Sequence, residues 1–380
     1  MSRVLWMAGV LAIAAAPAVA QNEAPQGSRR QQVMERKADL LARAPSATSS
    51  KALAPTVRVN CHKGKSLQAA LDNTAGPVIV EVRGLCHENV EVARDDVTLR
   101  GEDPAKDGIR GVAADPLPPA ALQVRHASRV HLENLSISES PGVGIGVWWS
   151  DVYMLNCRVE ANALQGLRAE AASYVDGSEL TISSNGKAGI VAQHSQMFCL
   201  GCRLEANATF AAASAQSAYL ALEESVVSGK NGLFALDGGH VDIDCFSYET
   251  SYPCSLTVTQ RAAFAVGTGD AALFGVVSFE GSLVAGGTGY VLLYGARQRQ
   301  ADGPMNLVSE FATLEAVGVD PAAGISELAN PTEVMGFGRL LLDSGSVLSG
   351  PLTCEGGGDA YLEPGVTVAP GQVTGCVHIP

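Results

Sequence analysis

The sequence predicts an all-β protein, a right-handed single-stranded parallel β-helix with an N-terminal capping helix. The first indication is a repeated segment: CRVEANA at Cys157–Ala163 returns as CRLEANA at Cys202–Ala208, 45 residues later. The second is a hydrophobic position that recurs in steps of 22 or 23 residues, which is the length of one turn of a coiled sheet. The residues at that position are Ile137, Val159, Ile182, Leu204 and Val227.

The composition of each turn indicates strands rather than helices. In the segment Leu180–Ser183, apolar and polar residues alternate, so that Leu180 and Ile182 face inward while Thr181 and Ser183 face outward. Since no helical spacing interrupts the repeats, successive strands are expected to stack into one parallel sheet per face.

A corner follows each of these strands. Asparagines occupy the first corner position, and we expect them to form a hydrogen-bonded ladder along the axis, at Asn162, Asn185 and Asn207. Glycines come a few residues later, where a left-handed backbone is expected, at Gly166, Gly189 and Gly232.

The N-terminus has the pattern of a secretory signal peptide. A basic start precedes an apolar run from Val4 to Ala16, and Ala18-Val-Ala20 provides a small-residue cleavage site. The run is too short to span a bilayer stably, and no later stretch reaches transmembrane length. We therefore expect residues 1–20 to be removed and the mature protein to be periplasmic or secreted.

The rest of the chain divides by composition. Residues 21–55 are rich in arginine and end in a Pro/Ser/Ala stretch, so they are interpreted as a basic helix on a linker. Residues 56–380 form the β-helix domain, with regular coils over about 121–248 and an irregular insert over about 249–336. Lys65–Asp72 contains a serine N-cap and helical apolar spacing, which predicts a helix that covers the first turn.

All nine cysteines lie after the signal peptide. Three pairs are expected to form disulfides: Cys61 with Cys86, Cys245 with Cys254, and Cys354 with Cys376. Cys157 and Cys202 alternate inward with core residues and are predicted to be small core side chains. The Cys199-Leu-Gly-Cys202 spacing stands without a second pair or nearby histidines, which disfavours a zinc or redox site.

The chain is acidic, with a formal net charge of −13, and from residue 66 onward it holds 16 basic and 36 acidic residues. That balance excludes nucleic acid as a ligand of the β-helix domain. It also disfavours a polyanionic glycan, unless a local basic strip or a bound cation compensates.

Four segments near the start of the β-helix resemble the entry of pectin lyase-like proteins: SLQAAL at 66–71, VIVEV at 78–82, HENVEV at 87–92 and VTLRGE at 97–102. Pectin methylesterases and many right-handed parallel β-helix proteins share that entry. The turns over 121–248 are similar to the parallel β-helix repeats of carbohydrate-binding and sugar-hydrolase proteins. The resemblance implies the fold, whereas the catalytic motifs of polygalacturonases and alginate epimerases are missing.

One outward constellation is His240-Val-Asp242-Ile-Asp244. In an extended strand these three polar side chains share one face at spacings of about 6.8 Å, and a register of 21 residues would place Glu223 beside Asp244. Carboxylates at that separation suit inverting glycoside hydrolysis or a hard cation such as calcium. The alternative is an ordinary polar face of an acidic protein.

A second constellation lies on the repeated segments. Arg158 with Glu160 and Arg203 with Glu205 should face outward two turns apart, about 9.6 Å. Such a strip could bind a sugar chain, or it could consist of exposed cross-strand ion pairs of small energetic value. Trp148, which is followed by a second tryptophan, is a candidate platform for a sugar ring.

Three functions remain open from the sequence. The first is a non-catalytic β-helix that binds polysaccharide or supports the cell envelope. The second is a polysaccharide lyase, epimerase or glycoside hydrolase with a divergent site. The third is an envelope assembly protein that contacts a protein partner through its basic arm. Neither a cofactor nor a membrane span is predicted.

Overall fold

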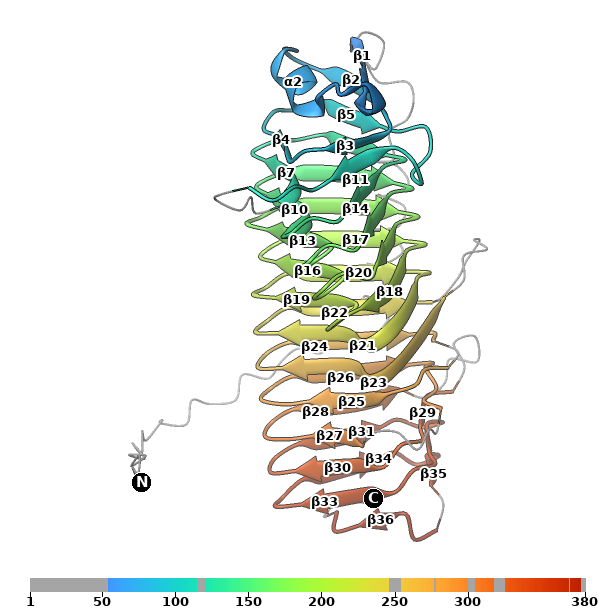
Figure 1. The fold of residues 1–380 in the computed structure, drawn as a ribbon. Helices are drawn as coiled ribbons and strands as arrows, with labels where there is room; N and C mark the ends of the chain where they lie inside the picture. The colour runs from blue at the N-terminus through green and yellow to red at the C-terminus, as the bar shows by residue number, and fades with distance from the viewer. Residues whose placement is uncertain are drawn as a thin grey trace, which may run out of the picture. The chain divides into compact units, whose positions relative to one another are not determined.

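A computed structural model describes residues 54–114, 120–245, 254–276, 278–299, 305–317, 325–368 and 370–376. The expected signal peptide and nearly all of the expected basic arm lie outside these residues. The described chain is a parallel β-helix in which each turn adds one strand to each of its faces (Figure 1). All strand pairs with a determined register are parallel, as the prediction required.

One face, here called sheet A, consists of 14 strands within the described residues. They are β1 (Thr56–Asn60), β2 (Val78–Arg83), β5 (Val97–Arg100), β8 (Val130–Glu133), β11 (Asp151–Leu155), β14 (Tyr174–Ser178), β17 (Gln196–Leu200), β20 (Tyr219–Glu223), β22 (His240–Asp244), β24 (Asp270–Phe274), β26 (Tyr290–Tyr294), β28 (Thr313–Val317), β31 (Arg339–Leu342) and β34 (Asp359–Leu362).

The remaining faces, here called sheet B, contain 19 strands within the described residues. They are β3 (Leu85–His87), β4 (Val90–Val92), β6 (Gly108–Arg110), β7 (Ala120–Arg125), β9 (Ser136–Ser138), β10 (Val143–Trp148), β12 (Arg158–Glu160), β13 (Leu167–Glu170), β15 (Thr181–Ser183), β16 (Ile190–Gln193), β18 (Arg203–Asn207), β19 (Ala212–Ala215), β21 (Val226–Leu236), β23 (Ser255–Val266), β25 (Ser282–Ala285), β27 (Asn306–Val308), β30 (Thr332–Met335), β33 (Leu352–Glu355) and β36 (Val373–Thr374). Three short strands form a further sheet: β29 (Glu327–Leu328), β32 (Val347–Leu348) and β35 (Thr367–Val368).

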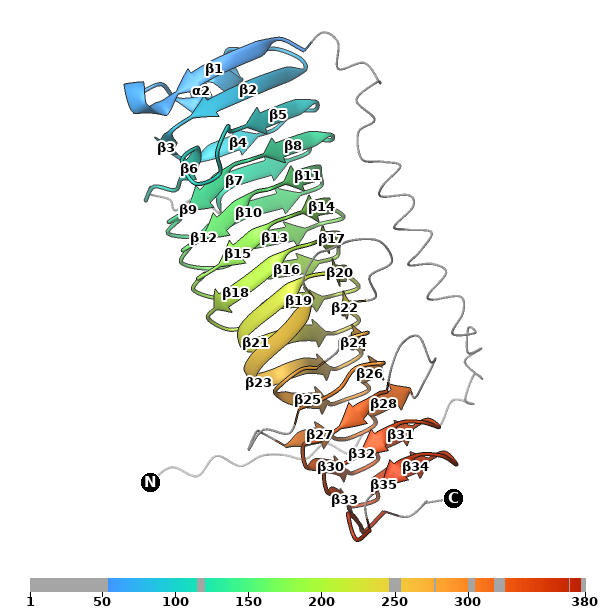
Figure 2. The same ribbon diagram turned by 90° about the vertical axis from the view of Figure 1, so that its right-hand side faces the viewer.

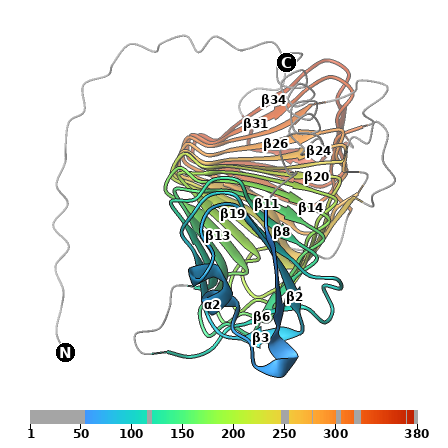
Figure 3. The same ribbon diagram turned by 90° about the horizontal axis from the view of Figure 1, so that it is seen from above.

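The recurring hydrophobic position forms one internal file. Val159 pairs with Ile137 on one side and Ile182 on the other, and the file continues through Leu204 and Val227. All five side chains are fully buried. Seen along the stack, the strands of successive turns lie above one another around this core (Figure 3). The period of the sequence is therefore confirmed as the period of the structure.

The asparagine ladder is also confirmed. Asn162 Nδ2 donates to Asn185 Oδ1 over 3.0 Å, and Asn185 Nδ2 donates to Asn207 Oδ1 over 2.9 Å. The three side chains are almost fully buried, so each bond satisfies polar groups that water cannot reach.

The expected reason for the glycines is wrong. The positive φ angles at this corner belong to Ala161, Ser184 and Ala206, and not to Gly166 or Gly189. A Cβ atom on Gly166 would instead lie 2.7 Å from Asn185 Nδ2, and one on Gly189 would lie 2.6 Å from Ala211 O. These glycines are required because the next turn approaches too closely for a side chain.

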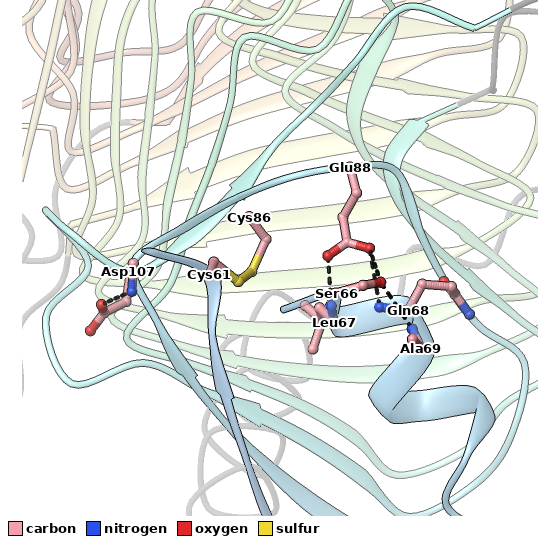
Figure 4. The surroundings of a disulfide bond; sticks show 9 residues. Cys61, Ser66, Leu67, Gln68, Ala69, Cys86, Glu88 and Asp107 are labelled. Atoms are coloured by element: carbon pink, nitrogen blue, oxygen red, sulfur yellow. Dashed lines mark hydrogen bonds between the residues drawn. A yellow bond between two sulfur atoms is a disulfide. The ribbon is translucent and has the colours of Figure 1, made fainter. Parts of the chain in front are cut away.

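The first turn is closed by the short helix α2 (Leu67–Asp72), which follows the 3-10 segment η2 (Cys61–Lys63). The Ser66 hydroxyl accepts a hydrogen bond from the Ala69 amide, and the carboxylate of Glu88 in the next turn accepts from the amides of Leu67 and Gln68 (Figure 4). Leu67 and Leu71 are buried against the core, which confirms the predicted capping helix.

Stacking continues through the stretch that the sequence predicted to be an irregular insert. Sheet A pairs His240 with Asp270, Asp270 with Tyr290, Tyr290 with Thr313 and Thr313 with Arg339. The number of residues per turn varies along these pairs, and the strands β21 and β23 grow to 11 and 12 residues. The period is lost in the sequence because the turns differ in length, although their strands still stack.

The cysteines form four disulfides. The three predicted pairs are present: Cys61 with Cys86, Cys245 with Cys254, and Cys354 with Cys376. The fourth joins Cys199 to Cys202 across the corner after β17, where both side chains point into the core. The interpretation of Cys202 as an unpaired core residue is therefore wrong. Four disulfides are typical of a protein that folds in an oxidising compartment.

Cys157 is the one free cysteine, and its thiol is buried. Burial raises the pKa of this thiol to about 12, so the reactive thiolate is suppressed at neutral pH. We expect no reaction with a thiol reagent in the native protein and one modified thiol per chain after unfolding without reductant. Titration of thiols before and after denaturation measures this, and three thiols on unfolding would contradict the Cys199–Cys202 pair.

Among the described residues, no helix has the length and apolar character needed to cross a membrane.

Candidate functional site

The outer face of sheet A carries a continuous series of aromatic rings, here called the ring ladder. The rings come from six consecutive strands, β8 to β22, and each contacts the next: His131, Tyr153, Tyr174, Phe198, Tyr219 and His240. Centroid separations run from 5.0 to 6.2 Å. Five of these residues are partly exposed, and Phe198 is 8% exposed.

The ladder follows from the strand pattern. Sheet A strands alternate inward aliphatic residues with outward residues, and the parallel register places outward positions of neighbouring turns about 4.8 Å apart. Aromatic side chains at that spacing are close enough to stack. An apolar strip on the outer face of a solvent-facing sheet is unusual, and such patches mark binding surfaces.

The ladder ends in a hydrogen-bonded polar cluster. The Tyr219 hydroxyl donates to Asp242 Oδ2 over 3.1 Å, and His240 Nε2 lies 2.9 Å from the same oxygen. His240 stacks on Tyr219 with centroids 5.0 Å apart and planes within 1° of parallel. Asp242 is only 5% exposed, so its carboxylate lies beneath the surface. Its contacts with the Tyr219 hydroxyl and His240 Nε2 hold both rings in place.

The structure brings the four residues of the first constellation onto adjacent strands. His240, Asp242 and Asp244 lie on β22, and Glu223 pairs with Asp244 in register from β20, with the spacing of 21 residues that the sequence suggested. Asp270 joins them from β24, with its Oδ2 3.9 Å from His240 Nδ1. Three or more ligand atoms lie within 4.8 Å of each other only at Cys61, Cys86 and Glu88 in the described chain, and two of these are disulfide sulfurs.

The sequence interpretation missed the ring ladder. Its members recur at intervals of 21 to 24 residues, one per turn, on positions that alternate with the inward file of sheet A. The signal was hidden because the residue type changes between His, Tyr and Phe, and because the rings alternate between two outward columns. A search for aromatic residues at the period of the core file would have found it.

The second constellation also lies where the sequence placed it. The strands β12, β15 and β18 follow one another in the stack (Figure 2). Thr181 of β15 pairs with Arg158 of β12 and with Arg203 of β18, so the two arginines are two turns apart. Each pairs with the glutamate two residues along its own strand, Arg158 with Glu160 at 3.0 Å and Arg203 with Glu205 at 2.5 Å. The ion pairs are therefore within strands, not across them.

The two tryptophans have different surroundings. Trp148 Nε1 donates to Glu170 Oε2 over 2.7 Å, and the Arg125 guanidinium lies 4.8 Å from the indole centroid. Trp149, in the corner before β11, is 55% exposed and stacks on His126 of the preceding turn at 4.9 Å. The exposed indole is thus Trp149 rather than Trp148, and it lies in the corner that leads into β11, the strand that carries Tyr153 of the ladder.

Comparison with known proteins agrees with the fold. Residues 117–247 match a family described as a right handed beta helix region. Similar solved structures include a pectin methylesterase with a hexasaccharide (11% identity, 63% of this chain, 80% of that chain, TM-score 0.36). A second is the A-module of the Azotobacter vinelandii mannuronan C-5 epimerase (14% identity, 82% of this chain, 91% of that chain, TM-score 0.42). A third is an Acinetobacter phage tailspike (10% identity, 83% of this chain, 61% of that chain, TM-score 0.44). At these identities the likeness concerns the fold alone. No curated protein matches the sequence.

Proposed function

Because the chain is a right-handed parallel β-helix protein, we propose that the outer face of sheet A binds an extended polysaccharide. The observation that supports this most is the ring ladder, which runs over six consecutive turns and ends at Tyr219, His240 and Asp242. A linear polymer is the ligand that can use a repeated platform of this kind, since each sugar ring meets a similar set of side chains.

The ladder combines the two interactions that sugars need. Aromatic rings offer apolar surface to the C–H faces of a pyranose. The carboxylates beside the rings accept hydrogen bonds from the hydroxyl groups of the sugar, and the side-chain hydroxyls both accept and donate. The expected signal peptide, which lies outside the described residues, and the four disulfides support an extracytoplasmic location, where such polymers occur.

A second candidate function is polysaccharide cleavage or epimerisation. The observation that favours it is the convergence of a phenol, an imidazole and a nearly buried carboxylate at one point of the ladder. These are groups that act as general acids and bases. Arg158, Glu160, Arg203 and Glu205 fit the proposal less well, because their charges are already paired with each other.

The double variant Tyr153→Ala, Tyr174→Ala tests the binding surface. Removing two rings worth about 0.5–1.5 kcal/mol each should weaken binding about tenfold or more. Binding is measured by affinity electrophoresis through gels that contain different polysaccharides. The matched control is Phe311→Ala, Phe337→Ala, which removes a stacked ring pair that is 66% and 65% exposed at a different corner.

The control variant should bind like the wild type, and both variants should unfold at the wild-type temperature within a few degrees. Equal retardation of the Tyr153/Tyr174 variant and the wild type in every gel would show that sheet A is not the binding surface.

A further inference from the structure

We infer that the polymer bound on sheet A is a cationic amino-sugar polysaccharide, with free amines along its chain, such as a polymer of glucosamine. This inference rests on the proposed function and specifies the ligand class for the same surface. It rests on the distribution of charge along sheet A.

The nine sheet A strands from β8 to β28 contain no lysine and no arginine. They contain eight carboxylates, distributed over seven of the nine strands: Glu133, Asp151, Asp176, Glu223, Asp242, Asp244, Asp270 and Glu315. Glu133 is paired with Arg100 of the preceding strand β5 over 2.6 Å, and Asp242 is only 5% exposed. The other six carboxylates still give this face an excess of negative charge, which attracts cations and repels anions.

The carboxylates lie beside the rings in the register of the sheet. Asp176 pairs with Tyr153 on one side and Phe198 on the other, and Asp270 pairs with His240. Neighbouring strands are about 4.8 Å apart, so a sugar that stacks on a ring has a carboxylate within reach of its substituents. An ammonium group on the sugar would meet that carboxylate as an ion pair.

Sheet B carries charged side chains of both signs. Three of its arginines are each bonded to a glutamate two residues away: Arg158 to Glu160, Arg168 to Glu170 and Arg203 to Glu205. Sheet B thus combines basic and acidic side chains, whereas the strands of sheet A from β8 to β28 contain acidic side chains and neither lysine nor arginine. The separation of charge favours a ligand that is specific to one face.

A carboxyl group just beyond β28, the last of the nine strands of sheet A that lack lysine and arginine, also favours a cationic ligand. Asp343 follows β31, and burial together with the charges of Glu315 and Glu363 raises the pKa of its carboxyl to about 6. The negative charges of Glu315 and Glu363 therefore disfavour the ionisation of Asp343, in addition to the effect of its burial. A cationic polymer would relieve that repulsion, and a polyuronate would increase it.

The experiment compares hexamers of glucosamine, N-acetylglucosamine and galacturonic acid by isothermal titration calorimetry at a pH where the amines are protonated. We expect the glucosamine hexamer to bind about tenfold tighter than the N-acetylated hexamer at low salt. The difference should shrink at high salt, because exposed charges are screened within about 10 Å at 0.1 M ionic strength. Galacturonate should bind weakest.

The double variant Asp176→Asn, Asp270→Asn should lose about fivefold or more in affinity for the glucosamine hexamer and leave that for the N-acetylated hexamer within about twofold. Stronger binding of galacturonate than of glucosamine, or an unchanged preference in the double variant, would overturn the inference.

Failure of the inference and failure of the proposed function give different results. If an uncharged or acidic hexamer binds best, and if its binding is weakened in the double variant Tyr153→Ala, Tyr174→Ala, then sheet A is the binding surface and the inferred ligand class is wrong. If the ring variant changes the binding of no hexamer, both are wrong.

Discussion

Replacing Asn185 with alanine is expected to lower the free energy of unfolding by about 3 kcal/mol, because several buried polar groups lose their partners at once. Asn185 Oδ1 accepts from the amide and the side-chain nitrogen of Asn162, and Asn185 Nδ2 donates to Val159 O and Asn207 Oδ1. Its side chain is 1% exposed, so water cannot replace these bonds in the native state. Urea denaturation followed by circular dichroism measures the loss.

The matched control is Asn156→Gly in the neighbouring turn. Asn156 also pairs with an asparagine one turn away, Asn134, but this bond is exposed and water can replace it. Glycine is chosen because Asn156 has a φ of 48°, which alanine tolerates poorly. The control should lose less than about 1 kcal/mol. Equal losses in the two variants would mean that the buried ladder contributes nothing beyond the turn itself.

The sequence was sufficient to predict the fold where one physical requirement recurs at a constant interval. The file from Ile137 to Val227 had to be apolar in every turn, because each member is fully buried between its neighbours. The buried asparagines recur for a similar reason, since a corner amide left without a partner would be costly. Where turns change length, as around β21 and β23, the same stacking leaves no fixed period to read.

The candidate site was predicted only in part, for a different physical reason. The placement of Glu223 beside Asp244 follows from register alone, which the sequence contains. Contacts between side chains depend on rotamers and on which outward column a residue occupies, and these do not follow from spacing. Hence the stacking of His240 on Tyr219, and the hydrogen bond from that tyrosine to Asp242, emerged only from the structure.

Replacing Asp242 with leucine is expected to weaken polysaccharide binding about a hundredfold, the largest effect of any single change on sheet A. Leucine has a similar volume but accepts no hydrogen bond, so the Tyr219 hydroxyl and His240 Nε2 would lose the oxygen that holds both rings parallel. The change also removes a negative charge that lies just beneath the surface. Calorimetry with the polysaccharide that the wild type binds measures the loss, and Glu160→Leu on sheet B is the control.

Asp242→Asn separates positioning from chemistry at the same atom. Asparagine keeps one side-chain oxygen that can accept from Tyr219 or His240, but it cannot take up a proton as a carboxylate does. If Asp242 only positions the rings, this variant should bind a neutral oligosaccharide within about threefold of the wild type, and neither protein should release product. If the cluster is catalytic, the wild type should generate reducing ends or unsaturated sugars, and Asp242→Asn should lose that turnover while it retains binding. Loss of neutral-oligosaccharide binding in Asp242→Asn as large as in Asp242→Leu would contradict both alternatives, because it would mean that one retained side-chain oxygen does not keep the rings in their binding geometry.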